Sequence, residues 1–167
     1  ERNVIHRDLK PANVLVVSDG WPLDVKITDF GLAKLLAEES SQNTKSFSLL
    51  GTPSYMAPEQ ARGRGRQIGP TADVYSLGAI FFELLTGRPP FLADSIQETL
   101  LRIRDTDPLA PRALNPSIPR DAETICLKAL EKEPRSRYAT AGDLARELDR
   151  FLRGQPIRAR PVGRFEK

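Results

Sequence analysis

The chain has 167 residues, of which 40% are hydrophobic and 28% charged, and its formal net charge at pH 7 is +3. This composition is ordinary for a soluble globular protein, and so small a positive excess does not imply binding to nucleic acid. The single cysteine excludes an internal disulfide framework and favours a reducing compartment, which predicts a cytoplasmic chain. The longest apolar stretch, residues 77–82, is too short to cross a bilayer.

The first predicted element is a β-hairpin. Residues 14–17 are rich in β-branched side chains, residues 18–20 read Ser-Asp-Gly, and residues 25–28 alternate again. Two such runs around turn residues are typical of paired antiparallel strands. The hairpin would bring the polar stretches that flank it, residues 6–13 and 29–31, face to face.

A long connection follows the hairpin. Residues 32–50 begin apolar, become polar and show no clear period, which predicts a mobile loop. Two prolines then rigidify residues 51–59. Residues 62–66 alternate arginine and glycine and are interpreted as a basic, solvated turn.

The second half of the chain is predicted to be helical. Residues 71–86 are apolar on nearly every side, which is typical of a buried helix, and Gly87 ends it. A short amphipathic helix is expected at residues 95–104, followed by an irregular, proline-rich segment at residues 105–119.

Two further helices complete the predicted fold. One covers residues 121–132, with acids in its first turn. The other begins at a capping box in residues 140–143 and ends near residue 153. We therefore expect one folded unit over residues 1–153 and a basic tail or linker over residues 154–167.

Three motifs in the chain resemble those of protein kinases. Residues 6–13 read His-Arg-Asp-Leu-Lys-Pro-Ala-Asn, residues 29–31 read Asp-Phe-Gly, and residues 57–59 read Ala-Pro-Glu. Their order and spacing also agree, and the resemblance continues through residues 73–78 and Arg137. In detail the chain is most similar to bacterial serine/threonine kinases of the eukaryotic type.

This resemblance implies a fold class and its boundaries. The expected class is α+β, mainly α: the C-terminal lobe of a kinase, a helical bundle around a buried central helix with a small β-hairpin. The Gly-rich loop, the phosphate-binding lysine and its glutamate partner are missing from the sequence. The N-terminal lobe is therefore expected to be absent, and this chain alone to be inactive.

The resemblance also implies a chemistry, ATP-dependent phosphorylation of protein serine and threonine hydroxyls. Phosphoryl transfer mainly requires positioning and charge neutralisation. Asp8 would orient the substrate hydroxyl toward the γ-phosphate, and Lys10 would stabilise the phosphoryl group in transfer. Asn13 and Asp29 would supply oxygen ligands to Mg²⁺ bound with ATP.

Leu15 would form the floor of the adenine pocket, although simple core packing is an alternative for this residue. Its neighbours Val14 and Val16 are expected to face Ile80 and Leu84 on the buried helix.

Other residues would support the site. His6, the only histidine, has the chemistry of a general base, but the family pattern implies that it packs under Phe30. Glu59 and Arg137 are expected to form a buried ion pair. Asp73, at the start of the buried helix, would hold the backbone of the catalytic loop.

A further group would recognise substrate or regulate the enzyme. Thr52 and Tyr55 would belong to a substrate platform, whose sequence together with Lys10 favours serine/threonine specificity. An arginine beside the catalytic acid can pair with a phosphorylated loop residue. The candidate regulatory residues are Arg7, Lys34, Thr44, Ser46 and Ser48, and an unmodified loop is the alternative.

Two other functions remain open at this stage: a non-catalytic binding module derived from a kinase, and a small-molecule kinase that shares the fold. The intact polar motifs disfavour the first, and the platform segment disfavours the second. The expected partners are protein substrates and the missing N-terminal lobe. The basic tail also suits the cytoplasmic side of a membrane protein whose anchor lies outside this chain.

Overall fold

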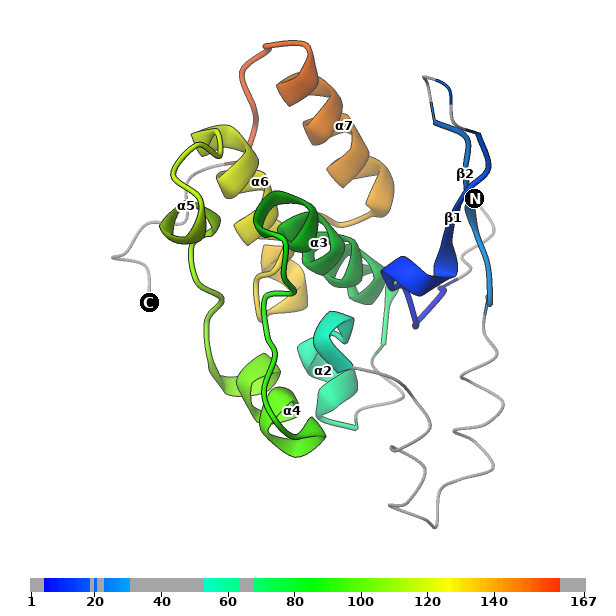
Figure 1. Ribbon diagram of the computed structural model, residues 1–167, viewed down its shortest axis with the longest axis vertical. Coiled ribbons are helices and arrows are strands. Elements are labelled where there is room, and N and C mark those ends of the chain that lie inside the picture. Colours follow the sequence, from blue (N-terminus) through cyan, green and yellow to red (C-terminus); the bar gives the residue numbers. More distant parts are fainter. Residues whose placement is uncertain (1–4, 19, 21–22, 31–52, 64–67, 160–167) are drawn as a thin grey trace.

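The computed structural model describes residues 5–18, 20, 23–30, 53–63 and 68–159. This part of the chain is mainly helical and contains one two-stranded sheet, which confirms that part of the expected fold class (Figure 1). Its elements in chain order are η1 (Pro11–Asn13), β1 (Val14–Val16), β2 (Val25–Ile27), η3 (Pro53–Tyr55), α2 (Pro58–Ala61), α3 (Pro70–Thr86), α4 (Ile96–Asp105), α5 (Pro111–Leu114), α6 (Arg120–Ala129), η5 (Pro134–Ser136) and α7 (Ala141–Leu152). Among the described residues, no helix is both long and apolar enough to span a membrane.

The predicted hairpin is present. Strands β1 and β2 pair antiparallel, with Val14 opposite Ile27 and Val16 opposite Val25. The ladder continues beyond the strands, because the Thr28 amide donates to the Asn13 carbonyl at 3.0 Å. The hairpin therefore brings the end of the first polar stretch beside the start of the second.

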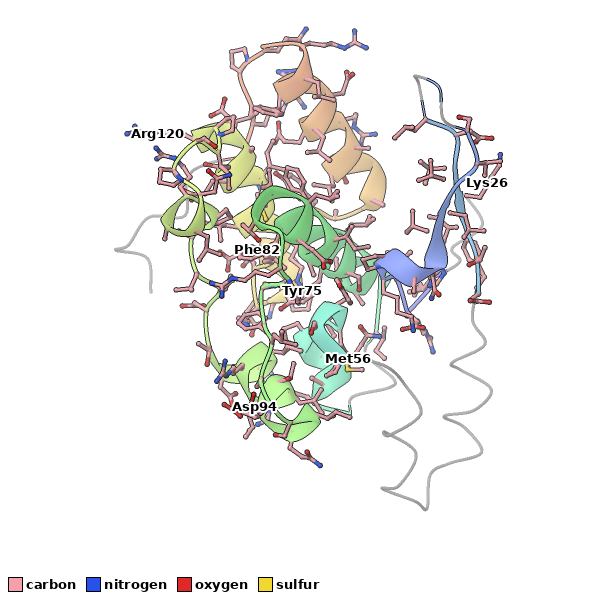
Figure 2. All side chains as sticks on the ribbon, viewed as in Figure 1. Lys26, Met56, Tyr75, Phe82, Asp94 and Arg120 are labelled. Carbon is pink, nitrogen blue, oxygen red and sulfur yellow. The ribbon has the colours of Figure 1, made fainter. Side chains whose placement is uncertain are left out.

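Helix α3 lies at the centre of the fold and packs against α6 and α7. Tyr75 and Phe82 are fully buried in the interior, whereas Lys26 lies on the outer hairpin (Figure 2). Gly78 allows α6 to approach closely, since a Cβ there would lie 2.7 Å from Cβ of Ala129. Gly87 ends the helix at a φ of 78°, as the sequence predicts.

The prediction that α3 is buried on nearly every side is wrong for the face that carries Leu84. Leu84 is 78% exposed, whereas Leu85 in the same turn packs against the core, so the exposure belongs to one face of the helix and not to the whole turn. Val16 is also 59% exposed, so the expected packing of Val16 on Leu84 does not form. The base of the hairpin instead meets the N-terminal end of α3, where Asp73 lies (Figure 1).

Two predictions about the segments between helices need correction. The irregular segment 105–119 contains α5, which begins at the buried Pro111 and is held by a 2.7 Å hydrogen bond from the Arg112 amide to Glu123 of α6. Proline suits the first turn of a helix because its missing N–H has no partner there in any case. Helix α6 ends at Ala129, three residues before the predicted residue 132, and η5 begins only at Pro134.

Helix α7 begins at the predicted capping box, in which Thr140 and Asp143 exchange hydrogen bonds of 3.1 Å. After the helix the chain folds back. The buried carboxylate of Glu147 accepts hydrogen bonds from the amides of Arg158, at 2.7 Å, and Ala159, at 2.8 Å. The described beginning of the predicted tail therefore packs against the helical core, which includes the buried Ala159.

Candidate active site

The backbone of residues 6–13, the candidate catalytic loop, is held at its start by a carboxylate from α3. Arg7 has a φ of 68°, in the left-handed region, which costs about 1–2 kcal/mol for a residue with a Cβ. The two oxygens of Asp73 accept hydrogen bonds from the amides of His6, at 2.8 Å, and Arg7, at 2.9 Å. Hydrogen bonds to a charged group contribute about 1.5–3 kcal/mol each, enough to offset the strained conformation.

Asp8 lies at the centre of a polar cluster. Lys10 donates from Nζ to Oδ2 of Asp8 at 2.8 Å, and Asn13 donates from Nδ2 to the Asp8 carbonyl at 2.8 Å and to Oδ2 at 3.3 Å. The 3-10 turn η1, which begins at Pro11, brings Asn13 back toward Asp8. The side chains of Asp8 and Lys10 are 32% and 26% exposed, so a ligand can reach them.

Asn13 and Asp29 have the donor atoms that Mg²⁺ prefers. Both hydrogen bonds of Asn13 to Asp8 use its nitrogen, so its carbonyl oxygen is the atom left for a cation. Asp29 is exposed and follows Thr28, whose amide bonds to Asn13. One carboxylate and one amide oxygen, completed by phosphates and water, fit the way Mg²⁺ binds in phosphoryl-transfer sites.

His6 is 2% exposed, and both of its ring nitrogens have partners. Nδ1 accepts a 3.3 Å hydrogen bond from the Asp8 amide, so the proton belongs on Nε2, which lies 2.7 Å from the Thr28 carbonyl. Its ring also packs against Phe30, with 4.8 Å between the centroids. His6 therefore links the catalytic loop to the end of β2, an arrangement suited to support and not to proton transfer.

Leu15 lies on β1 and is 49% exposed. The described hairpin leaves apolar side chains open to solvent on both faces, since Leu15 lies on one face and Val25 and Ile27, which are 48% and 42% exposed, lie on the other. Leu15 is therefore not a fully packed core residue.

The platform segment is fixed to α3 by two side chains. The hydroxyl of Tyr55 donates to Oε2 of Glu83 at 2.6 Å, and Ser76 donates to the Tyr55 carbonyl at 2.8 Å. Burial, together with this bond to Glu83, raises the pKa of Tyr55, so its hydroxyl keeps the proton that it donates. These contacts attach η3 to the central helix.

Glu59 and Arg137 form a bidentate ion pair, with both Arg137 nitrogens 2.8 Å from the carboxylate oxygens. The two side chains are 7% and 0% exposed. Arg137 also donates to the carbonyls of Thr71, Glu131 and Lys132. The pair therefore joins α2 to α3 and to the segment after α6.

Five candidate residues lie outside the described residues: Lys34, Thr44, Ser46, Ser48 and Thr52. Sequence reasoning also missed three polar contacts of the site region, those of Gln60, Ser76 and Glu83. Glu83 had a signal, because it is the one acid in the apolar run 77–85 of α3. Gln60 had only its position directly after Ala-Pro-Glu.

Comparison with known proteins agrees with this geometry. The protein kinase domain family matches residues 1–147. The chain is 38% identical over 162 residues to the serine/threonine-protein kinase PknB of Mycobacterium tuberculosis, and the match covers 97% of this chain and 25% of that protein. Identity to PknB of Mycobacterium leprae is 39%, with the same coverage.

A probable serine/threonine-protein kinase of Streptomyces coelicolor is 38% identical over 156 residues, which cover 93% of this chain and 22% of that protein. The chain thus spans about a quarter of the length of the curated relatives it matches. It belongs to the serine/threonine protein kinase family.

Proposed function

We propose that this chain is the C-terminal lobe of a kinase that transfers the γ-phosphate of ATP to serine or threonine hydroxyls of proteins. The observation that carries the proposal is the hydrogen-bonded cluster of Asp8, Lys10 and Asn13, together with the backbone bond that joins Asn13 to Thr28, the residue before Asp29. Mg²⁺ bound with ATP would neutralise phosphate charge there.

Each side chain of the cluster has a part in this mechanism. Asp8 accepts a hydrogen bond from the substrate hydroxyl and aims it at the phosphorus. Lys10, 2.8 Å from Asp8, provides a positive charge for the phosphoryl group as it passes between nucleophile and leaving group. Asn13 and Asp29 would hold the cation through their oxygens, and Leu15 would contact the adenine.

The experiment is a phosphorylation assay on the full-length protein that contains this chain, with Mg²⁺-ATP and serine/threonine peptides. Asp8→Asn keeps the main-chain carbonyl that Asn13 binds but loses the anionic acceptor, so kcat is expected to fall about 100-fold or more. Asp121→Asn, an exposed acid in the first turn of α6, is the matched control and is expected to retain activity.

Three outcomes separate the functions. Loss of transfer in Asp8→Asn but not in Asp121→Asn supports the kinase. A wild-type protein that binds protein partners without transferring phosphate is instead a binding module. Transfer to small hydroxyl compounds but not to peptides would identify a small-molecule kinase. The 167-residue chain alone is expected to be inactive, because its sequence does not contain the Gly-rich loop and the phosphate-binding lysine of the N-terminal lobe.

Two finer assignments belong to the same proposal. Arg7 would pair with a phosphorylated residue of the segment 44–48, assisted by Lys34, and Thr52 with Tyr55 would contact the substrate peptide. The kinase would act in the cytoplasm, including on the inner side of a membrane to which a segment outside this chain anchors it.

A further inference from the structure

Gln60, in the short helix α2, makes two hydrogen bonds that connect the platform region to the catalytic loop. Its Nε2 donates to the Arg7 carbonyl at 2.7 Å, across 53 residues of sequence. Its Oε1 accepts a 3.0 Å hydrogen bond from the amide of Ala57, on its own segment. One side chain therefore serves two roles, a local cap and a long-range tether.

The tether acts on a particular peptide group, the one that joins Arg7 to Asp8. Its carbonyl oxygen is held by Gln60, and its N–H points to Nδ1 of His6 at 3.3 Å. The preceding amide, that of Arg7, is held by Asp73. The peptide plane that carries Asp8 is thus fixed on both edges, directly after a residue with a φ of 68°.

This geometry matters because a left-handed residue with a Cβ relaxes if its hydrogen bonds are lost. Relaxation of Arg7 would rotate the Arg7–Asp8 peptide and move the Asp8 carboxylate. A displacement of about 1 Å at a reacting group can cost about 100-fold in rate.

We propose that Gln60 is a positioning residue, which fixes the orientation of Asp8 through the Arg7 carbonyl and so couples the placement of α2 to the catalytic acid. This inference rests on the proposed kinase function. It predicts that the hydrogen-bond donor of residue 60, and not its acceptor, sets kcat.

Two opposite substitutions separate the two bonds. Gln60→Glu keeps an acceptor for the Ala57 amide but places a carboxylate oxygen against the Arg7 carbonyl. Gln60→Lys keeps a donor for Arg7 and loses the acceptor. Gln155→Glu and Gln155→Lys, at an exposed position after α7, are the charge-matched controls.

The assay is steady-state phosphorylation by the full-length protein, together with hydrogen exchange of a peptide that contains residues 6–10. For Gln60→Glu we expect a 10- to 100-fold fall in kcat, little change in KM for ATP or peptide, and faster exchange in the loop. Gln60→Lys is expected to keep kcat within about threefold of wild type, with protected loop amides.

A reversed order, with Gln60→Glu active and Gln60→Lys impaired, would show that Gln60 is only a local cap. Equal loss in both variants, with equal falls in melting temperature, would also overturn the proposal. If the wild type and Asp8→Asn are both inactive, the proposed function fails. The exchange measurement still decides whether Gln60 holds the Arg7–Asp8 peptide.

Discussion

The guanidinium of Arg137 meets the carboxylate of Glu59 through two hydrogen bonds of 2.8 Å, across 78 residues of sequence. The guanidinium also lies over the aromatic ring of Tyr75, whose centroid is 5.0 Å from Cζ of Arg137. The pair is nearly inaccessible to water, so each charge depends on the other for its solvation.

Removal of one member should be expensive. For Glu59→Gln we expect the free energy of unfolding to fall by about 3–5 kcal/mol, because the Arg137 charge stays buried without its counter-ion. Urea unfolding followed by circular dichroism measures the change. Glu98→Gln is the control, since Glu98 pairs with Arg102 at 2.6 Å on the surface and both side chains are 47% exposed. It should cost less than about 1 kcal/mol. Equal losses would contradict this account.

Gly78 and Gly142 should respond in opposite directions to the same change. Gly78→Ala places a Cβ 2.7 Å from Cβ of Ala129 and 3.2 Å from its backbone carbon, so α3 and α6 must move apart. We expect a loss of about 1–3 kcal/mol from this overpacking. At Gly142, in α7, an added Cβ would lie 3.5 Å from its nearest neighbour, the Arg146 side chain. Alanine there should raise the free energy of unfolding by about 0.5–1 kcal/mol, because its helix propensity is higher than that of glycine. Thermal melting of both variants decides the signs.

Cys126 should resist labelling until the core opens. It is fully buried, and burial raises the pKa of its thiol above the ordinary value of 9.0. The native thiol therefore stays protonated between pH 7 and 9, whereas the thiolate fraction of an unfolded chain rises across that range. Labelling with a disulfide reagent should follow the urea unfolding curve. Rapid labelling in buffer would contradict the burial.

Asp73→Asn should loosen the candidate catalytic loop without unfolding the domain. The amide nitrogen would face one of the two backbone N–H groups that Asp73 now accepts, so one bond is lost and the other weakens. We expect a cost of about 1.5–3 kcal/mol and faster hydrogen exchange at residues 6 and 7. Asp94→Asn, at an exposed site far from the loop (Figure 2), is the control. Unchanged protection in Asp73→Asn would contradict the role of its carboxylate.

Much of the fold follows from local signals in the sequence. The hairpin, the glycine stop at Gly87 and the capping box at Thr140 each depend on residues close in sequence, and each is present. Periodicity could not show that the face of α3 that carries Leu84 is left uncovered, so the exposure of Leu84 was missed. The helix α5 was missed because its support, Glu123, comes from another element.

The candidate site divides in the same way. Its polar residues were found from motif spacing, and the contacts of Asp73 and Arg137 from the family resemblance. Gln60 was not found, because nothing near it in sequence indicates that its side chain reaches Arg7. Long-range side-chain contacts to backbone groups depend on how α2 and α3 are placed, which sequence pattern alone does not specify.

The strained loop also has a consequence for how the protein folds. Arg7 is synthesised before the groups that fix it, Gln60 and Asp73, which lie 53 and 66 residues later in the sequence. Contacts between residues so far apart in sequence form late in folding and lower the folding rate. The loop around Arg7 is therefore translated before the residues that shape it. Until α3 has docked, a nascent chain is expected to hold its site residues without the geometry that makes them a site.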